Sequence, residues 1–162
     1  MQAHKMLLDE VEEDLFNLLA IYCSIEDFKM AFLLNKHLKL RLKREREDVD
    51  FMYQNIQAHY ARFTFKDPTT FHSYNLVANK FKGQPSKVLN SGSLFAEEEV
   101  RPQEINLIPE YKKVDFFLKI GEDLPEQHCN KLVNIISQIP QVIAVHKIDV
   151  DRLKSKQNLI FE

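Results

Sequence analysis

The pattern of apolar and polar positions predicts a strand, a helix and a second strand near the start of the chain. Residues 15–22 are apolar except for Asn17, which is typical of a central strand covered on both faces. A helix is expected to open at Ser24, with Asp27 at the spacing of a capping partner. Residues 38–43 then alternate, which predicts a strand. Phe28, Ala31, Phe32, Asn35 and Leu38 recur at helical spacing. Met30, Leu33 and Leu34 widen this stripe, so the helix is expected to pack against more than one surface.

The middle of the chain is less regular. Residues 44–50 carry mixed charges, and we interpret the stretch that follows, through His59, as a loop or a weakly marked helix. Two strands are expected at 60–66 and 71–81, joined by a turn at Asp67 and Pro68.

Turn-forming residues gather after the second of these strands. Gly, Pro, Ser and Asn recur at 83–93, which predicts a mobile loop inside the domain. Residues 94–108 are expected to be irregular or short extended structure, because no period is sustained there.

The last part of the chain repeats the order strand, helix, strand. Alternation at 114–120 predicts a strand, and Asp123 and Glu126 stand at capping-box spacing for a helix that ends before Pro140. Residues 142–148 predict the next strand. The expected buried stripe of this helix is Cys129, Leu132, Val133, Ile136 and Ile139.

Two strand-helix-strand units, at 15–43 and 114–148, define the expected architecture. Each unit favours a right-handed crossover, and a hairpin lies between them. We therefore predict a single α+β domain over residues 1–162, with a mainly antiparallel sheet and both helices on one face, in a ferredoxin-like or regulatory-domain-like sandwich. Short outer strands are expected at 4–9 and 159–161.

Composition places the chain among ordinary soluble domains. It has 162 residues, of which 44% are hydrophobic and 28% charged, enough to bury a core in one domain. The net charge of -2 gives no overall attraction to nucleic acid or membrane. Two separated cysteines indicate a reducing compartment, and neither a membrane span nor an apolar signal core is present. We expect a cytoplasmic protein.

Scarce glycine and cysteine exclude several chemistries. The three glycines, Gly83, Gly92 and Gly121, cannot form a P-loop or a dinucleotide-binding turn. Cys23 and Cys129 do not have the spacing of zinc ligands. No hydrolase, kinase or metalloprotease motif occurs, so we assign no catalytic residue and expect no cofactor and no metal. We favour a binding protein over an enzyme.

One segment resembles a known family. Ile108-Pro109-Glu110 followed by Val114-Asp115-Phe116 is similar to the motif of the IPExxxVDY family of uncharacterised Bacteroidota proteins, with Phe116 where that motif has Tyr. The resemblance implies no particular activity. Loss of the hydroxyl rules out a catalytic role for it in this chain. Similar segments in the same order are Ala20-Ile21-Tyr22, Asp27-Phe28, Leu34-Asn35-Lys36 and residues 153–161.

The two carboxylates of this motif are the first candidate site. Glu110 and Asp115 could form an acid–base pair if both faced one cavity. The favoured alternative is structural: Pro109 sets a turn, Glu110 caps a backbone amide, and Asp115 lies on the outer face beside Lys119. Asp115 is the more informative of the two, because a strand interior disfavours aspartate.

A basic stripe is the second candidate. Lys39, Arg41, Lys43 and Arg44 could follow a phosphate backbone, with aromatic residues of the next strand offering stacking surfaces. Four acidic residues between 45 and 50 would cancel much of this charge. A solvated face that protects a strand edge is therefore favoured over nucleic-acid binding.

A polar group near the C-terminus is the third candidate. Lys154, Lys156 and Asn158 could bind an anion or an acidic partner. The favoured alternative is a turn that delivers the last apolar residues into the sheet. Asn35 and Cys23 are both expected to be structural, one as a hydrogen-bonded amide on the helix stripe and one as a buried thiol.

These observations favour a non-catalytic binding or regulatory module that acts through protein contacts or a small ligand. A protein partner is expected, and a homodimer is one form of it, since such sheets often pair. The alternative is an RNA-binding protein that uses the basic face around residues 39–46. A second alternative is an unrecognised enzyme that uses Glu110 and Asp115.

Overall fold

The computed structural model describes residues 15–85, 101–122 and 124–161. The outer strand predicted at 4–9 lies outside these ranges, as do Asp123 and most of the loop predicted at 83–93. The described chain forms an α+β domain, as the sequence predicts.

A six-stranded antiparallel sheet is the centre of the domain. Its strands are β1 (Phe16–Tyr22), β2 (Lys43–Arg44), β5 (Arg62–Lys66), β6 (Ser73–Ala78), β9 (Phe116–Gly121) and β10 (Ala144–Ile148). They lie in the order β10-β1-β9-β6-β5-β2. The apolar run before Tyr22 is thus an inner strand, as predicted, because neighbours pair with it on both sides.

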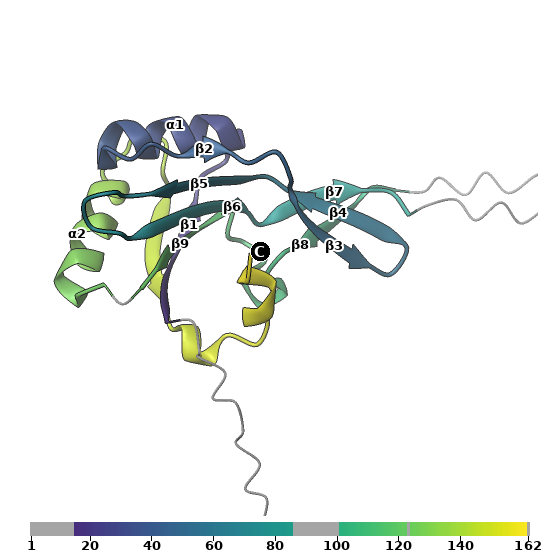
Figure 1. Ribbon diagram of the computed structural model, residues 1–162. Coiled ribbons are helices and arrows are strands. Elements are labelled where there is room, and N and C mark those ends of the chain that lie inside the picture. Colours follow the sequence, from purple (N-terminus) through teal and green to yellow (C-terminus); the bar gives the residue numbers. More distant parts are fainter. Residues whose placement is uncertain (1–14, 86–100, 123, 162) are drawn as a thin grey trace, which may run out of the picture.

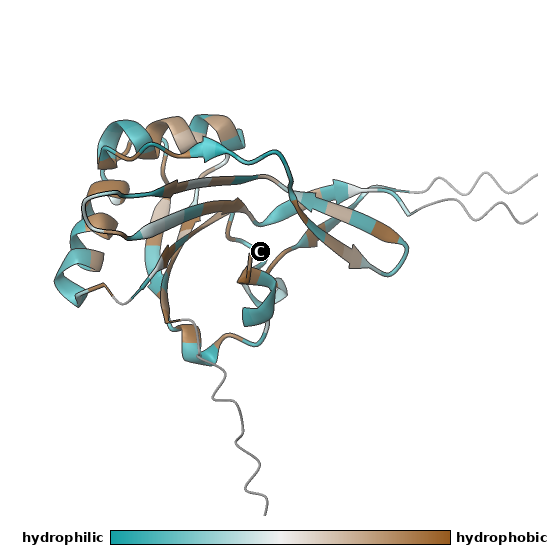
Figure 2. Ribbon diagram, viewed as in Figure 1, coloured by the Kyte–Doolittle hydropathy of each residue, from teal (hydrophilic) through white to brown (hydrophobic). Residues whose placement is uncertain are grey.

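Two helices cover one face of this sheet. They are α1 (Asp27–Leu38) and α2 (Glu126–Ser137), and Figure 1 shows them together at one side of the molecule. In Figure 2 both helices carry brown and teal patches, as amphipathic helices do. The apolar core beneath them includes Leu19, Met30, Leu34, Leu76, Leu118, Leu132 and Ile136.

The buried stripe of α1 differs from the predicted one. Phe28 and Phe32 are 59% and 64% exposed, whereas Met30, Ala31 and Leu34 face the core. The expected burial of Ala31, Met30 and Leu34 is confirmed, and the expected burial of both phenylalanines is wrong. Apolar residues stand on nearly every side of this helix, so the sequence alone did not fix which side faces the sheet.

The strand predicted at 38–43 is largely replaced by an irregular extended segment. Lys39 ends α1 in the left-handed conformation, with φ 56°, and β2 spans only Lys43–Arg44. The predicted alternation is nevertheless present: Leu40 and Leu42 are buried, and the cations that alternate with them, Lys39, Arg41 and Lys43, are exposed. The Asn35 amide takes the place of a neighbouring strand, accepting from the Leu42 amide at 2.8 Å and donating to its carbonyl at 3.1 Å.

A β-hairpin occupies the region predicted as loop or helix before His59, so that prediction is wrong. Strands β3 (Val49–Tyr53) and β4 (Ile56–Tyr60) pair directly, and Gln54 in the turn has φ 51°. A second hairpin joins β7 (Lys80–Gly83) to β8 (Gln103–Asn106). Both hairpins lie at the end of the molecule away from the helices (Figure 1).

The C-terminal segment packs on the sheet face opposite the helices. It forms two short 3-10 helices, η2 (Val150–Arg152) and η3 (Lys156–Leu159), so the terminal strand predicted at 159–161 is wrong. Leu153 and Leu159 are buried against Phe16, Leu18 and Phe117 of β1 and β9. These apolar side chains cover the second face of the inner strands. A further strand at the sheet edge would not cover that face.

The second strand-helix-strand unit, β9-α2-β10, follows the prediction closely. Helix α2 ends at Ser137, ahead of Pro140, and Cys129, Leu132 and Ile136 are buried in it as expected. Within the described ranges, no helix is both long and apolar enough to cross a membrane.

Candidate functional site

The segment from Ile108 to Phe116 wraps around one buried side chain, Asn79. A 3-10 turn, η1 (Pro109–Tyr111), opens it, so Pro109 sets a turn as predicted. The Asn79 amide donates at 2.9 Å to the carbonyls of Tyr111 and Val114, and its oxygen accepts from the Ile108 amide at 2.9 Å. Sequence reasoning missed Asn79. Its only signal was a polar residue closing the apolar run of β6.

Glu110 binds the C-terminal segment. Its two oxygens accept from the amide and the hydroxyl of Ser155, at 2.8 and 2.9 Å. Partial burial pushes the pKa of Glu110 upward, but hydrogen bonds from Ser155, Lys154 and its own backbone outweigh that effect and hold the pKa below its usual value. Capping of a backbone amide, the structural alternative, thus describes this carboxylate.

Asp115 is paired differently from the prediction. Its side chain is 17% exposed, accepts from the Cys23 amide at 2.8 Å and lies 2.9 Å from the Lys80 ammonium. The expected neighbour Lys119 has a different partner, because its ammonium donates to the Leu159 carbonyl at 2.7 Å. Asp115, directly before β9, therefore joins this strand to the end of β1 and to β7. Burial, followed by the Asp115 charge, raises the pKa of the Cys23 thiol.

A hollow of about 550 Å³ lies beside Asp115, and Glu110 is not part of its lining. Its charges are mixed, with Lys80 and Lys82 facing Glu26, Asp27, Glu104 and Asp115. All four carboxylate oxygens of Glu110 and Asp115 have structural partners. The two residues are thus not arranged as an acid–base pair around one cavity.

The C-terminal candidates do not gather into one site. Asn158 donates to the Leu107 carbonyl at 2.9 Å, the Lys156 ammonium lies 5.8 Å from the centre of the Phe16 ring, and Lys154 is exposed. The contacts of Asn158 and Lys156 hold the segment that brings Leu159 into the core. The favoured interpretation placed these residues in a turn leading to a terminal strand of the sheet, whereas the structure has the 3-10 helix η3 there.

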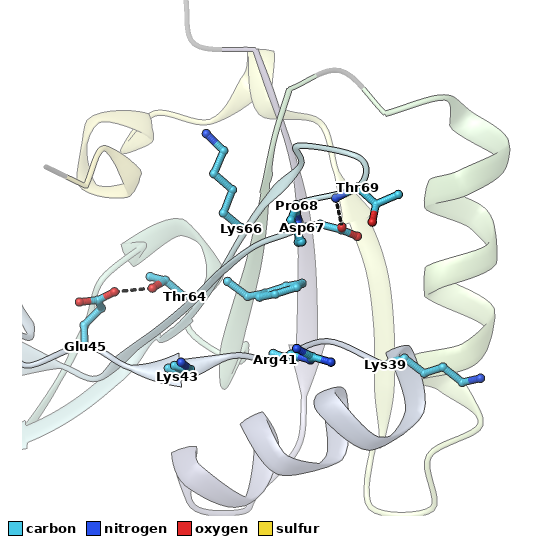
Figure 3. A pocket seen from close by; sticks show the side chains of 10 residues that line it. Lys39, Arg41, Lys43, Glu45, Thr64, Lys66, Asp67, Pro68 and Thr69 are labelled. Carbon is cyan, nitrogen blue, oxygen red and sulfur yellow. Dashed lines mark hydrogen bonds between the residues drawn. The ribbon is translucent and has the colours of Figure 1, made fainter.

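A second hollow is an open groove at the β2 edge of the sheet. We call it the basic groove. Its volume is about 650 Å³, and Lys39, Arg41, Lys43 and Lys66 supply its positive charge. Figure 3 shows the first three following one another along residues 39–43, with Lys66 arising from β5. The remaining lining residues are Glu45, Thr64, Phe65, Asp67, Pro68 and Thr69.

The acidic side chains of the basic groove are bound within the protein. Glu45 accepts from the Thr64 hydroxyl, and Asp67 accepts from the Thr69 amide at 2.8 Å (Figure 3). The hydrogen bond from Thr69 lowers the pKa of Asp67, which keeps this carboxylate charged. None of the four cations forms an ion pair within the described ranges.

Arg44, the fourth predicted nucleic-acid residue, does not line the basic groove. Its guanidinium pairs with Asp48 and lies 5.7 Å from the centre of the Phe63 ring. Lys66 is the fourth cation of the groove, and sequence reasoning missed it because it belongs to β5. Strands β3 and β4 separate β5 from β2 in the sequence, and only strand pairing brings the two together.

The fold and the basic groove define an α+β domain with an open, positively charged site at a sheet edge. Among the described residues, no group of three or more His, Cys, Asp and Glu side chains could hold a metal. Comparison of the chain with protein-family models, with curated proteins and with solved structures found no match.

Proposed function

We propose that this protein is a non-catalytic binding module and that the basic groove takes a phosphate-bearing ligand. The single observation behind this proposal is the charge balance of the groove. Four cations face it without an ion-pair partner in the described part of the chain, while its two carboxylates are held by Thr64 and Thr69. Unpaired Lys and Arg beside a recess attract anions, and phosphate oxygens accept from both side chains.

Structural use of the motif carboxylates supports a binding role over catalysis. Glu110 closes the C-terminal segment and Asp115 joins three elements, so neither oxygen pair is free to exchange protons with a substrate. The alternative of an enzyme that uses Glu110 and Asp115 has correspondingly less support.

The finer fold and family are part of the same proposal. The order β10-β1-β9-β6, with a helix after β1 and after β9, supports a ferredoxin-like arrangement extended at one edge by β5 and β2. The structural roles of Pro109, Glu110 and Asp115 offer a reason for the motif shared with the IPExxxVDY family. Two free, buried cysteines agree with a cytoplasmic location.

The direct test is titration of the isotopically labelled protein with inorganic tripolyphosphate at low salt, followed by NMR. We expect saturable shifts confined to the amides of residues 39–45 and 64–69. The double variant Lys43→Gln/Lys66→Gln should weaken binding by roughly 10-fold or more, because it removes two charge-assisted hydrogen bonds to the ligand.

The matched control is Lys112→Gln/Lys131→Gln, which removes the same charge from exposed positions outside the basic groove. It should leave the affinity unchanged. Absence of saturable shifts in the native protein, or equal weakening by the control, would overturn the proposed function.

A protein partner or a homodimer remains a prediction of the sequence. Sedimentation velocity over micromolar concentrations tests the homodimer, and a strict monomer throughout would contradict it.

A further inference from the structure

Strand register aligns four polar side chains in one row across the sheet. Lys43 of β2 stands opposite Thr64 of β5, Thr64 opposite Asn75 of β6, and Asn75 opposite Lys119 of β9. Directly opposed residues share a face of a sheet. Phe63, Tyr74 and Leu76 of the same strands face the helices, so the row lies on the other face.

The described residues cover only part of that face. The C-terminal segment packs over β1 and β9, and Lys119 marks its border, with the ammonium 4.7 Å from the Phe16 ring centre and bonded to the Leu159 carbonyl. The part over β2, β5 and β6 carries polar side chains. We call it the open strip, formed by Lys43, Arg62, Thr64, Lys66, Ser73 and Asn75.

The open strip combines positive charge with unused hydrogen-bonding groups. Three of its six residues are cationic and none is acidic. The side chains of Ser73 and Asn75 form no hydrogen bond with other described residues. Arg62 lies with its guanidinium 5.2 Å from the Phe161 ring centre, and its buried Nε has no partner there.

The open strip and the basic groove are one continuous surface, because Lys43, Thr64 and Lys66 belong to both. Strand spacing of about 4.8 Å makes the open strip roughly 10 Å wide from β2 to β6. Cations two residues apart on an extended segment recur at roughly 7 Å. This surface is much larger than one phosphate group and is suited to a chain of regularly spaced anions.

We propose that the ligand of this surface is single-stranded nucleic acid, with phosphates along the basic groove and bases over the open strip. This inference rests on the proposed function. Sequence-tolerant recognition of a single strand needs cations for the backbone together with planar and hydrogen-bonding groups for the bases. Arg62 beside Phe161 supplies a plane, and Ser73 and Asn75 supply the neutral donors and acceptors. An acidic peptide would need only the cations.

The test is fluorescence anisotropy with labelled single strands of about ten nucleotides, a length within the range of single-strand sites. Arms contain RNA, DNA, an abasic strand of equal charge, a duplex and inorganic tripolyphosphate as competitor. We expect RNA or DNA single strands to bind more tightly than the abasic strand and the duplex. Lys43→Gln/Lys66→Gln should lower the slope of log K against log salt by roughly 0.7 for each phosphate that is no longer neutralised.

Asn75→Ala separates base recognition from simple charge attraction. It should weaken binding of the intact single strand by about 3- to 10-fold, as removal of one hydrogen-bonded side chain predicts, and leave tripolyphosphate and abasic-strand binding unchanged. The control is again Lys112→Gln/Lys131→Gln, with circular dichroism to verify folding of each variant.

Three outcomes would overturn the inference. Equal affinity for the intact and abasic strands would reduce the surface to a general anion site, and equal or tighter duplex binding would exclude a single-strand ligand. Binding of tripolyphosphate but of no oligonucleotide at low salt would contradict the single-stranded nucleic-acid ligand and would still agree with the proposed phosphate-binding function. If neither ligand binds, the proposed function fails as well.

Discussion

Glu110 accepts two hydrogen bonds from Ser155, one from the amide at 2.8 Å and one from the hydroxyl at 2.9 Å, across 45 residues of sequence. The pair links the turn before β9 to the start of η3. Because the acceptor is ionised, each bond is stronger than one between neutral groups.

Replacement of Glu110 by Gln should destabilise the protein in a pH-dependent way. The folded-state pKa of Glu110 lies below its unfolded value, so the carboxylate stabilises the fold above about pH 4.3 and loses this effect as the pH falls through the folded pKa. Urea unfolding of both proteins at several pH values measures it. The difference should be largest near neutral pH and shrink in acid; a constant difference would contradict the assigned role.

Asn79→Ala should be severely destabilising. The side chain is fully buried, and truncation removes the partner of the Ile108 amide and of the Val114 carbonyl, while the Tyr111 carbonyl keeps only the Val114 amide. We expect the free energy of unfolding to fall by about 2 to 4 kcal/mol. Asn75→Ala, which lies in β6 and in the open strip, is the control and should change stability by less than about 0.5 kcal/mol. Equal effects from both would mean that Asn79 does not organise the motif segment.

The orientation of α1 can be tested by matched truncations. Leu34→Ala should cost about 2 to 4 kcal/mol, because it opens a cavity in the core, whereas Phe32→Ala should stay within about 0.5 kcal/mol. Chemical denaturation of the two variants gives both values. The reverse order would mean that Phe32, and not Leu34, faces the core.

Tyr60 should control stability in alkali. Burial raises the pKa of Tyr60 to about 12, and its hydroxyl donates to the Ile105 carbonyl at 3.0 Å. The protonated form is favoured by the fold, so its stabilisation is complete below pH 10 and is lost as the pH rises toward 12. Tyr60→Phe should cost about 1 kcal/mol at neutral pH and show a weaker decline between pH 10 and 12, measured by urea unfolding.

Elements with a strong period were predictable, and those set by distant partners were not. The alternation from Val114 to Ile120 and the helix before Pro140 matched the structure, because local pattern and packing agree there. The β3-β4 hairpin was missed because its turn, at Gln54, lacks the glycine that usually marks such turns, and because Ala58 weakens the apolar face of β4.

The candidate site was predictable only in part. The exposed cations Lys39, Arg41 and Lys43 followed from alternation, and all three line the basic groove. Lys66 lies at the groove because β5 pairs with β2. Arg44 lies outside the groove, where its guanidinium forms an ion pair with Asp48. A single sequence does not record either relationship.

The C-terminal segment covers an apolar face of the sheet, so the protein needs an uncut chain to stay soluble. Cleavage by trypsin after Arg152 or Lys154 would detach Leu159, leaving Phe16 and Phe117 as an uncovered apolar surface on an intact sheet. A cleaved molecule would then expose this apolar surface beside its cationic surface. Aggregation would thus be the first observable effect of losing the segment that contains Leu159.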